Sequence, residues 1–357
     1  MEKQRLARLR QEMEQQRLEA ILITNPYNRK YMTGFTGSSG YGLITADRAY
    51  LLTDFRYMTQ APAQAVEYEV VEHEAKPMAT VKSLLGQLNI KRLGFEQNSV
   101  TFGTYASYAK DLAGIELVPV DALVEKLRMY KDEREIQIIQ EAADLADRTF
   151  SYVTGILKPG MTEEEVALEM EFFMRKHGAT GTSFETIVAS GERSALPHGV
   201  ASGRTLKGNE FVKFDFGALY KDYCSDLTRT VCLGQPTDKH KEIYSIVLDA
   251  QLNVLDKLKP GMTGREGDAL ARDIIAKAGY GDYFGHGTGH GIGMEIHEAP
   301  RLSLHSDMVL EPGMVVTVEP GIYLPGFGGV RIEDDVVITD SGIRILTQSS
   351  KAFTVID

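Results

Sequence analysis

A glycine-rich stretch in the second half of the chain carries three histidines, a residue type common at metal and proton-transfer sites. The stretch reads GHGTGHGIGMEIHE and places His286, His290 and His297, three of the chain's eight histidines, within twelve residues. Its alternating glycines allow the backbone to approach a ligand closely. For one histidine alone a structural role would be the better interpretation, but three together favour a functional site.

Four acidic residues lie in strand-like segments, two before this stretch and two after it. Asp215 lies in the alternating segment FVKFDFG and Asp226 opens a second one, so a hairpin with a connecting loop would place them on adjacent strands. Glu319 ends the β-branched run MVVTVEPG, and Glu333 lies in VRIEDDVVI, which reads as one strand. A solvated face is the alternative, but carboxylates in such apolar segments favour pairing or metal binding.

An internal repeat divides the second half of the chain. The hexapeptide LKPGMT occurs at Leu157–Thr162 and again at Leu258–Thr263, an offset of 101 residues, and each copy precedes a helical pattern. The threonine of each copy suits a helix N-cap, with Glu165 or Glu266 three residues later in capping-box spacing. Two unrelated turns are the alternative, but the matched flanks favour a duplication.

The acidic residues follow nearly the same offset as the repeat. Glu319 lies 104 residues after Asp215, and Glu333 lies 107 residues after Asp226. The duplication therefore predicts two half-domains related by a pseudo-twofold axis, with their strands in a shared sheet. Two carboxylates from each half would meet near that axis.

Such a cluster of carboxylates predicts a metal site. Four neighbouring carboxylates would repel one another unless cations, about two divalent ions, neutralised them. Oxygen-rich ligation with one imidazole suits Mn²⁺, Co²⁺ or Zn²⁺, and the excess of carboxylates favours Mn²⁺. Two such ions can lower the pKa of a shared water, which is hydrolytic chemistry. The sequence has neither a dinucleotide-binding fingerprint nor P-loop spacing.

Composition sets the class of protein around this site. The 357 residues are 43% hydrophobic and 25% charged, which is typical of a globular protein with room for two domains. A net charge of −11 disfavours nucleic acid and anionic membranes as partners. The N-terminal segment has no apolar signal core. The chain has only two cysteines, Cys224 and Cys232, so a disulfide framework is not indicated and a reducing compartment fits. We therefore expect a cytoplasmic protein.

The elements around the site predict an α/β (α+β) fold with two domains. Residues 1–125 alternate between helical and strand-like pieces and predict a small α/β domain without a metal site. Residues 126–357 contain the repeat and all the candidate site residues. The segment 121–147 reads as one long helix, with Asp121 as a possible N-cap, that opens the second domain.

The motifs DFG…SDLTRT, GHGIGMEIHE, TVEPG and VRIEDD together resemble the creatinase, prolidase, aminopeptidase P and methionine aminopeptidase superfamily. The resemblance covers the whole second domain. It implies a creatinase-like N-terminal domain over 1–125 and a catalytic domain of the pita-bread fold over 126–357. It also implies a homodimer. The superfamily's five metal ligands match Asp215, Asp226, His290, Glu319 and Glu333.

The resemblance also implies how the metal ligands are shared. Asp226 would be a bidentate ligand of one ion, and Asp215 and Glu333 would bridge the two ions. His290 and Glu319 would bind the other ion. A metal-bridging hydroxide would then attack the carbonyl carbon of the peptide bond before proline, while Glu319 would carry the proton to the leaving nitrogen.

Four further residues receive roles from the resemblance. His297, together with a metal, would stabilise the oxyanion. His198, in the segment LPHG, and His286 would contact the proline portion of the substrate. Arg331 would orient a neighbouring carboxylate. A structural hydrogen bond is the alternative for each histidine.

The resemblance leaves the substrate class partly open. Methionine aminopeptidases generally lack the N-terminal domain, and creatinase lacks the metal ligands, so prolidase and aminopeptidase P remain. The expected substrates are Xaa-Pro dipeptides or short peptides with proline second. Two alternatives are a non-catalytic pita-bread binding protein and a metal hydrolase that acts on another ester or amide bond.

Overall fold

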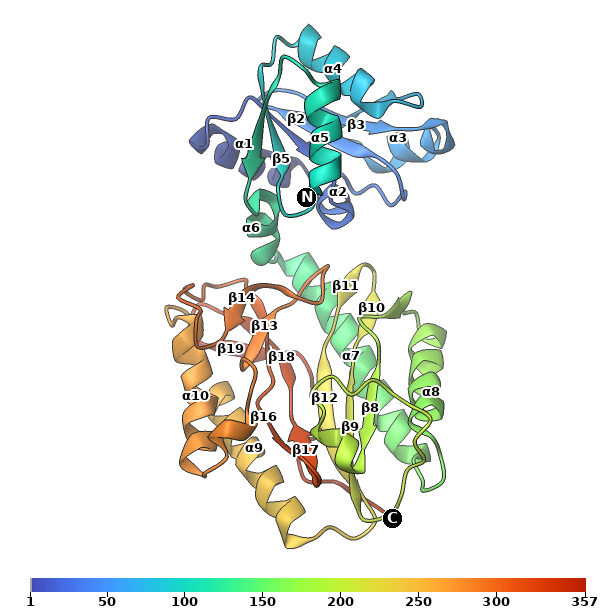
Figure 1. Ribbon diagram of the computed structural model, residues 1–357, viewed down its shortest axis with the longest axis vertical. Coiled ribbons are helices and arrows are strands. Elements are labelled where there is room, and N and C mark those ends of the chain that lie inside the picture. Colours follow the sequence, from blue (N-terminus) through green and yellow to red (C-terminus); the bar gives the residue numbers. More distant parts are fainter. Residues whose placement is uncertain (1) are drawn as a thin grey trace. The chain divides into compact units, whose positions relative to one another are not determined.

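The fold is seen in a computed structural model that describes residues 2–357 (Figure 1). The chain divides into two compact units, Met1–Arg128 and Met129–Asp357. Both units combine helices with strands, which confirms the predicted α/β (α+β) class. Within residues 2–357, no helix is both long enough and apolar enough to cross a membrane.

The first unit is built on a six-stranded sheet in the order β4-β3-β2-β1-β5-β6. Strand β1 runs parallel to β5 and antiparallel to β2, and β5 runs parallel to β6. The strands are β1 (Ala20–Ile23), β2 (Tyr41–Thr45), β3 (Ala49–Thr53), β4 (Glu69–Glu72), β5 (Arg92–Glu96) and β6 (Glu116–Val120). The helices are α1 (Glu2–Gln15), α2 (Pro26–Thr33), α3 (Gln60–Gln64), α4 (Pro77–Gln87), α5 (Phe102–Asp111) and α6 (Leu123–Met129).

The single helix predicted over 121–147 is wrong, because two helices occupy this segment. Helix α6 ends at Met129, and α7 (Glu133–Ile156) begins after Asp132. The Asp132 side chain accepts hydrogen bonds from the backbone of Arg134 and Glu135 at 3.0 and 2.9 Å, and this capping box starts a new helix. An interior aspartate that bonds the backbone in this way competes with helix continuation.

The second unit repeats a pair of helices. Helix α7 packs with α8 (Glu163–Lys176), and α9 (Asp238–Lys257) packs with α10 (Gly264–Lys277); Figure 1 shows the pairs on opposite sides of the strands. Thr162 and Thr263 are the N-cap residues of α8 and α10, each with the predicted capping box. The N-cap expectation for both copies of the repeat is therefore confirmed.

The strands of the second unit form several ladders rather than the single shared sheet that we expected. One has the order β20-β12-β9-β8 and another the order β14-β13-β15-β18-β19, while β11-β10-β7 and β16-β17 are smaller. The first two ladders are joined where the backbone of Glu333 donates to the carbonyl of Thr228 at 3.1 Å. The strands are β7 (Gly181–Thr182), β8 (Ile187–Ser190), β9 (Glu210–Phe216), β10 (Ala218–Tyr220), β11 (Tyr223–Cys224), β12 (Leu227–Leu233), β13 (Gly289–Gly291), β14 (Glu298–Leu302), β15 (Val315–Val318), β16 (Gly321–Leu324), β17 (Gly328–Arg331), β18 (Asp334–Ile338), β19 (Ile343–Ile345) and β20 (Val355–Ile356).

Each half of the second unit has its own apolar core. In the first half, Phe150 of α7 and Met170 of α8 pack with Phe214 of β9. In the second half, Ile275 of α10 belongs to a cluster with Val316 of β15. Burying each such side chain contributes about 1.5–3 kcal/mol, so these cores hold the strands that carry the acidic residues.

Candidate functional site

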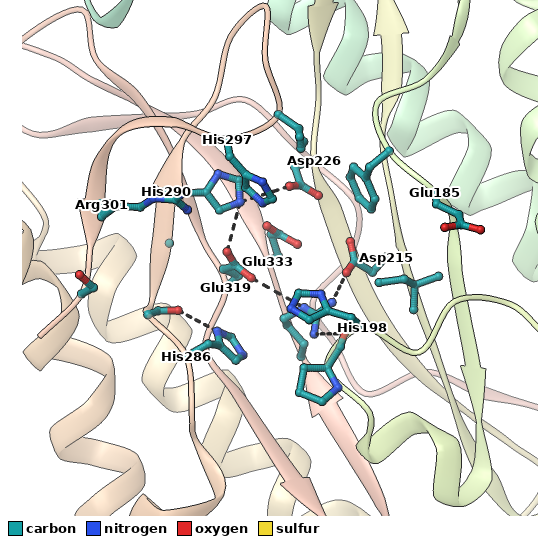
Figure 2. A pocket seen from close by; sticks show the side chains of 18 of the residues that line it. Glu185, His198, Asp215, Asp226, His286, His290, His297, Arg301, Glu319 and Glu333 are labelled. Carbon is teal, nitrogen blue, oxygen red and sulfur yellow. Dashed lines mark hydrogen bonds and ion pairs between the residues drawn. The ribbon is translucent and has the colours of Figure 1, made fainter. Parts of the chain in front are cut away.

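A cavity of about 450 Å³ is lined by residues from both halves of the second unit (Figure 2). The structure brings all the site residues predicted from the sequence to this one cavity. They are His198, Asp215, Asp226, His286, His290, His297, Glu319, Arg331 and Glu333. Figure 2 shows the four acidic residues of this set around a common space.

The first-half carboxylates are placed by two paired strands. Asp215 lies in β9 opposite Thr228 of β12, and Asp226 immediately precedes β12. The segment between them is not the plain loop that we expected, because β10 and β11 pair with each other. Lys221 and Asp222 make the tight turn with φ values of 47° and 71°, the left-handed conformation that a two-residue hairpin needs.

The second-half carboxylates lie where strands end. Glu319 follows β15, and Glu333 lies between β17 and β18, so the continuous strand predicted for VRIEDDVVI is wrong. The backbone N–H of Glu333 donates to the carbonyl of Thr228 in the first half. The chain therefore leaves the β16-β17 ladder before Glu333 and enters the ladder that contains β18 after it. This break brings the Glu333 side chain to the boundary between the two halves.

Three of the expected ligands form a compact group. Ligand atoms of Asp226, His290 and Glu333 all lie within 4.8 Å of one another, and the three residues are buried. Asp226 Oδ1 and Glu333 Oε1 are buried without a hydrogen-bond partner. Because an unpartnered buried carboxylate oxygen is costly, this arrangement fits a bound cation.

The His290 ring is oriented for metal binding. Its Nδ1 donates to the carbonyl of Gly291 at 3.0 Å, which leaves the Nε2 lone pair free. Nε2 lies 3.4 Å from Glu319 Oε1 and 3.6 Å from Asp226 Oδ2. Burial lowers the pKa of His290 to about 3, so the ring is neutral and able to act as a ligand.

The acidic group is electrostatically strained when no cation is present. Burial, reinforced by the charges of neighbouring carboxylates, raises the pKa of Asp226 and of Glu333 well above the usual range. Burial and the nearby Asp215 raise the pKa of Glu319 to about 7, although Arg331 opposes the rise. A divalent cation would relieve this repulsion and favour the ionised carboxylates.

Arg331 connects the group of Asp226, His290 and Glu333 to the rest of the cavity. Its guanidinium donates to Asp215 Oδ2 and, through Nε, to Thr228 Oγ1 at 3.1 Å. Thr228 Oγ1 in turn donates to Glu333 Oε2 at 2.5 Å. Arg331 also donates to Tyr323 Oη at 2.7 Å. The arginine therefore orients one candidate metal ligand directly and another through Thr228.

The cavity histidines other than His290 fall into two types. His286 is fixed: its Nδ1 donates to the Gly287 carbonyl at 2.8 Å, and its Nε2 accepts from Tyr323 Oη at 2.7 Å. Burial lowers the pKa of His286 to about 4. His198 and His297 are exposed to the cavity, and neither imidazole has a hydrogen-bond partner within residues 2–357. These two rings are available to a ligand.

Three residues of the site were not predicted from the sequence. Tyr323 bridges Arg331 and His286, but nothing in its local sequence marks it, because the bridge depends on how β16 and β17 pair. Arg301 and Glu185 lie on the cavity wall, apart from each other in Figure 2. Arg301 follows the histidine-rich stretch in β14, so its nearness to His297 in the sequence could have marked it.

The chain is similar over its whole length to known peptidases. Residues 137–340 match the model of metallopeptidase family M24, and residues 5–130 match the creatinase/prolidase N-terminal domain. The uncharacterized peptidase YqhT of Bacillus subtilis is 54% identical over 352 residues, which cover 99% of this chain and 100% of that protein. The Xaa-Pro dipeptidase from Bacillus anthracis has 52% identity and a TM-score of 0.98, with 99% and 100% covered. The X-Pro aminopeptidase from Thermotoga maritima has 40% identity and a TM-score of 0.91, with 97% and 100% covered.

Proposed function

Because the chain belongs to metallopeptidase family M24, we propose that it is a metal-dependent exopeptidase that cleaves the peptide bond before proline. Its substrates would be Xaa-Pro dipeptides or longer peptides that begin with Xaa-Pro. The observation that carries this proposal is the compact group of Asp226, His290 and Glu333, with two unpartnered buried carboxylate oxygens. Similarity to an Xaa-Pro dipeptidase and to an X-Pro aminopeptidase supports the substrate class.

Two divalent ions would be held by the five candidate ligands, Asp215, Asp226, His290, Glu319 and Glu333. The excess of carboxylates favours Mn²⁺, with Co²⁺ and Zn²⁺ as alternatives. When bound, the ions supply an ionised water at neutral pH and polarise the scissile carbonyl. The donor set fits these ions, because four carboxylates and one neutral imidazole are ligands that hard or borderline cations prefer.

The chain's own groups would then manage protons and charge. Glu319, whose Oε1 lies 3.4 Å from His290 Nε2, would accept a proton from the attacking water and return it to the leaving proline nitrogen. His297 is exposed to the cavity, and its ring centre lies 4.5 Å from that of His290. From this place it would donate to the oxyanion that develops on the scissile carbonyl. Arg331 would keep Asp215 oriented through its direct hydrogen bond.

The remaining cavity residues would position the substrate. His198 and His286 would contact the proline side, His198 with an unpaired ring and His286 with a ring fixed by Tyr323. Arg301 also lines the cavity and carries a positive charge. In a dipeptide the proline has a free carboxylate, which Arg301 would neutralise. A longer peptide lacks that charge at this position.

Three further features belong to the proposal. We infer that 1–125 acts as a creatinase-like N-terminal domain and that 126–357 is the pita-bread catalytic domain. A homodimer and a cytoplasmic location also remain predictions, drawn from family resemblance and from composition. Size-exclusion chromatography with light scattering would test the dimer.

One assay series tests the proposal. The Mn²⁺-loaded enzyme is given Ala-Pro, Ala-Pro-Ala and a phosphotriester, and release of alanine or alcohol is measured. Hydrolysis of either peptide with little phosphotriester cleavage is the expected result, and the ratio of the two peptide rates separates dipeptidase from aminopeptidase action. Full metal loading without peptide hydrolysis would favour a binding protein, and preferential phosphotriester cleavage would favour a different hydrolase.

A further inference from the structure

Lys213 is fully buried in β9, two residues before Asp215. No acidic side chain within residues 2–357 forms an ion pair with it. A buried amino group is costly unless its N–H groups are satisfied, so its hydrogen-bond partners indicate what it contributes. Lys213 does not line the cavity itself, but one of its hydrogen-bond partners, Pro197, does.

The partners of Lys213 are the backbone carbonyls just before His198. Its Nζ donates to the carbonyl of Leu196 at 2.6 Å and to that of Pro197 at 3.3 Å. Arg331 also donates to the Pro197 carbonyl, at 3.1 Å. One side chain from β9 and one from β17 thus converge on the peptide group that joins Pro197 to His198.

The His198 ring depends on this backbone for its place. The ring is exposed and has no hydrogen bond of its own within residues 2–357. The turn also has internal bonds, from Leu196 N–H to Arg193 and from Gly199 N–H to Leu196 at 2.8 and 3.3 Å. Those bonds shape the turn, whereas the Lys213 bonds attach it to the sheet that carries Asp215.

Lys213 also contacts the other fixed part of the cavity wall. Its Nζ lies 5.0 Å from the ring centre of Tyr323, a cation–π arrangement. Tyr323 in turn bonds His286 Nε2. The same buried lysine therefore lies between the segment that carries His198 and the tyrosine that fixes His286.

We propose that Lys213 is a positioning residue that anchors the Leu196 and Pro197 carbonyls and so holds the His198 imidazole toward the catalytic cavity. The inference rests on the proposed function, because that function assigns His198 to the proline side of the substrate. Lys213 touches neither the substrate nor the metal ligands in this role. It acts through the backbone that precedes His198.

The test begins with Lys213→Met, which shortens the unbranched side chain by one atom and removes its N–H donors. We expect kcat/KM for Ala-Pro to fall about tenfold, mainly through KM, because a small displacement of a substrate-contacting group is sufficient for such a loss. Metal content should stay at the wild-type level. The matched control is Lys221→Met, since Lys221 is exposed and pairs with Glu141. Its activity should stay within about twofold of wild type.

A double-mutant cycle separates positioning from general damage. In a His198→Ala background, Lys213→Met should lower kcat/KM by less than about twofold, because the group it positions is already gone. The same tenfold loss in both backgrounds would overturn the proposal, as would an unchanged rate in Lys213→Met alone. If Lys213→Met does not melt cooperatively, the cycle is run with Lys213→Gln, which keeps a polar group at the buried position.

A second readout does not depend on peptide hydrolysis. The protein is labelled at histidine with ¹³C, and the ring signals of His198 are identified by their loss in His198→Ala. These signals should shift in Lys213→Met and stay in place in Lys221→Met; unshifted signals in Lys213→Met would contradict the positioning role. If the wild type cleaves no Xaa-Pro peptide, the proposed function fails, and this measurement still decides the role of Lys213.

Discussion

Replacing Glu333 by glutamine tests the proposed metal site through two opposite effects. It should weaken metal binding, and it should stabilise the metal-free protein. Glu333 is 1% exposed; its Oε2 accepts from Thr228, and its Oε1 has no partner. Glutamine keeps the shape but removes the charge that a cation needs. Changes even to the residues that hydrogen-bond metal ligands lower metal affinity about 10–100-fold. We therefore expect Glu333→Gln to lower the affinity for Mn²⁺ about 100-fold or more. Peptide hydrolysis should be lost in parallel.

The size of the effect follows from ligand linkage. At a Mn²⁺ concentration of about 100 times the wild-type Kd, bound metal stabilises the wild type by about 2.7 kcal/mol. For a domain of about 150–250 residues this raises Tm by about 5–10 °C. A 100-fold weaker variant would gain about 0.4 kcal/mol at the same concentration, or about 1–2 °C.

Without metal the same substitution should stabilise the protein. The pKa of Glu333 is raised in the folded state, so its contribution to stability is present at low pH and is lost as the pH rises through the folded pKa. Keeping the Glu333 carboxyl buried is therefore less favourable at pH 8 than at pH 5, and glutamine has no such titrating group. Metal-free Glu333→Gln should melt above the metal-free wild type at pH 8, and the difference should shrink toward pH 5.

The assay is thermal unfolding of both proteins, with and without Mn²⁺. Glu311→Gln is the matched control, since Glu311 is exposed and outside the cavity. It should show the full wild-type response to metal. A variant Glu333→Gln that keeps the wild-type Tm increase, metal content and peptidase activity would refute the role of Glu333 as a ligand.

Three further predictions follow from the same geometry. His297→Ala should lower kcat by about 100-fold with normal metal content, because the ring would donate to the oxyanion. Steady-state kinetics, with metal content measured by atomic absorption, checks this. A parallel loss of metal would mean that the role of His297 is structural. Burial raises the pKa of Asp226 well above normal and that of Glu319 to about 7, so metal binding should release protons and the apparent Mn²⁺ affinity should increase from about pH 6 to pH 8. Calorimetric titration in two buffers of different ionisation enthalpy measures the release, and a pH-independent affinity would contradict it. Arg301→Gln should lower kcat/KM for Ala-Pro about tenfold more than for Ala-Pro-Ala, since it would remove a charged hydrogen bond that only the dipeptide carboxylate makes; equal losses on both peptides would exclude that contact.

Local signals in the sequence predicted much of this architecture. The superfamily, the fold class and the assignment as a metallo-exopeptidase are confirmed by the family matches and the structural neighbours. The repeat also predicted where α8 and α10 begin, because Thr162 and Thr263 bond their own backbone neighbours. Capping is a local interaction between residues three apart, and a single sequence therefore contains it.

The predictions that are wrong concern segments whose structure depends on long-range contacts. Asp132 stops a pattern that reads as one helix, because its side chain and the bond from Lys131 N–H to the Gly313 carbonyl favour a break. Glu333 leaves its strand because its N–H bonds Thr228 of the other half. Tyr323 enters the site only through partners at long range. No periodicity within a short segment reports these contacts.

The proposed mechanism requires that acidic residues from two copies of one unit share a pair of divalent ions. Anomalous X-ray diffraction from Mn²⁺-soaked crystals, measured at the manganese edge, tests it most directly. Two anomalous peaks are expected in the cavity, contacted by Asp215, Asp226, His290, Glu319 and Glu333. A cavity that holds one ion or none under saturating Mn²⁺, or ions bound by other residues, would contradict it.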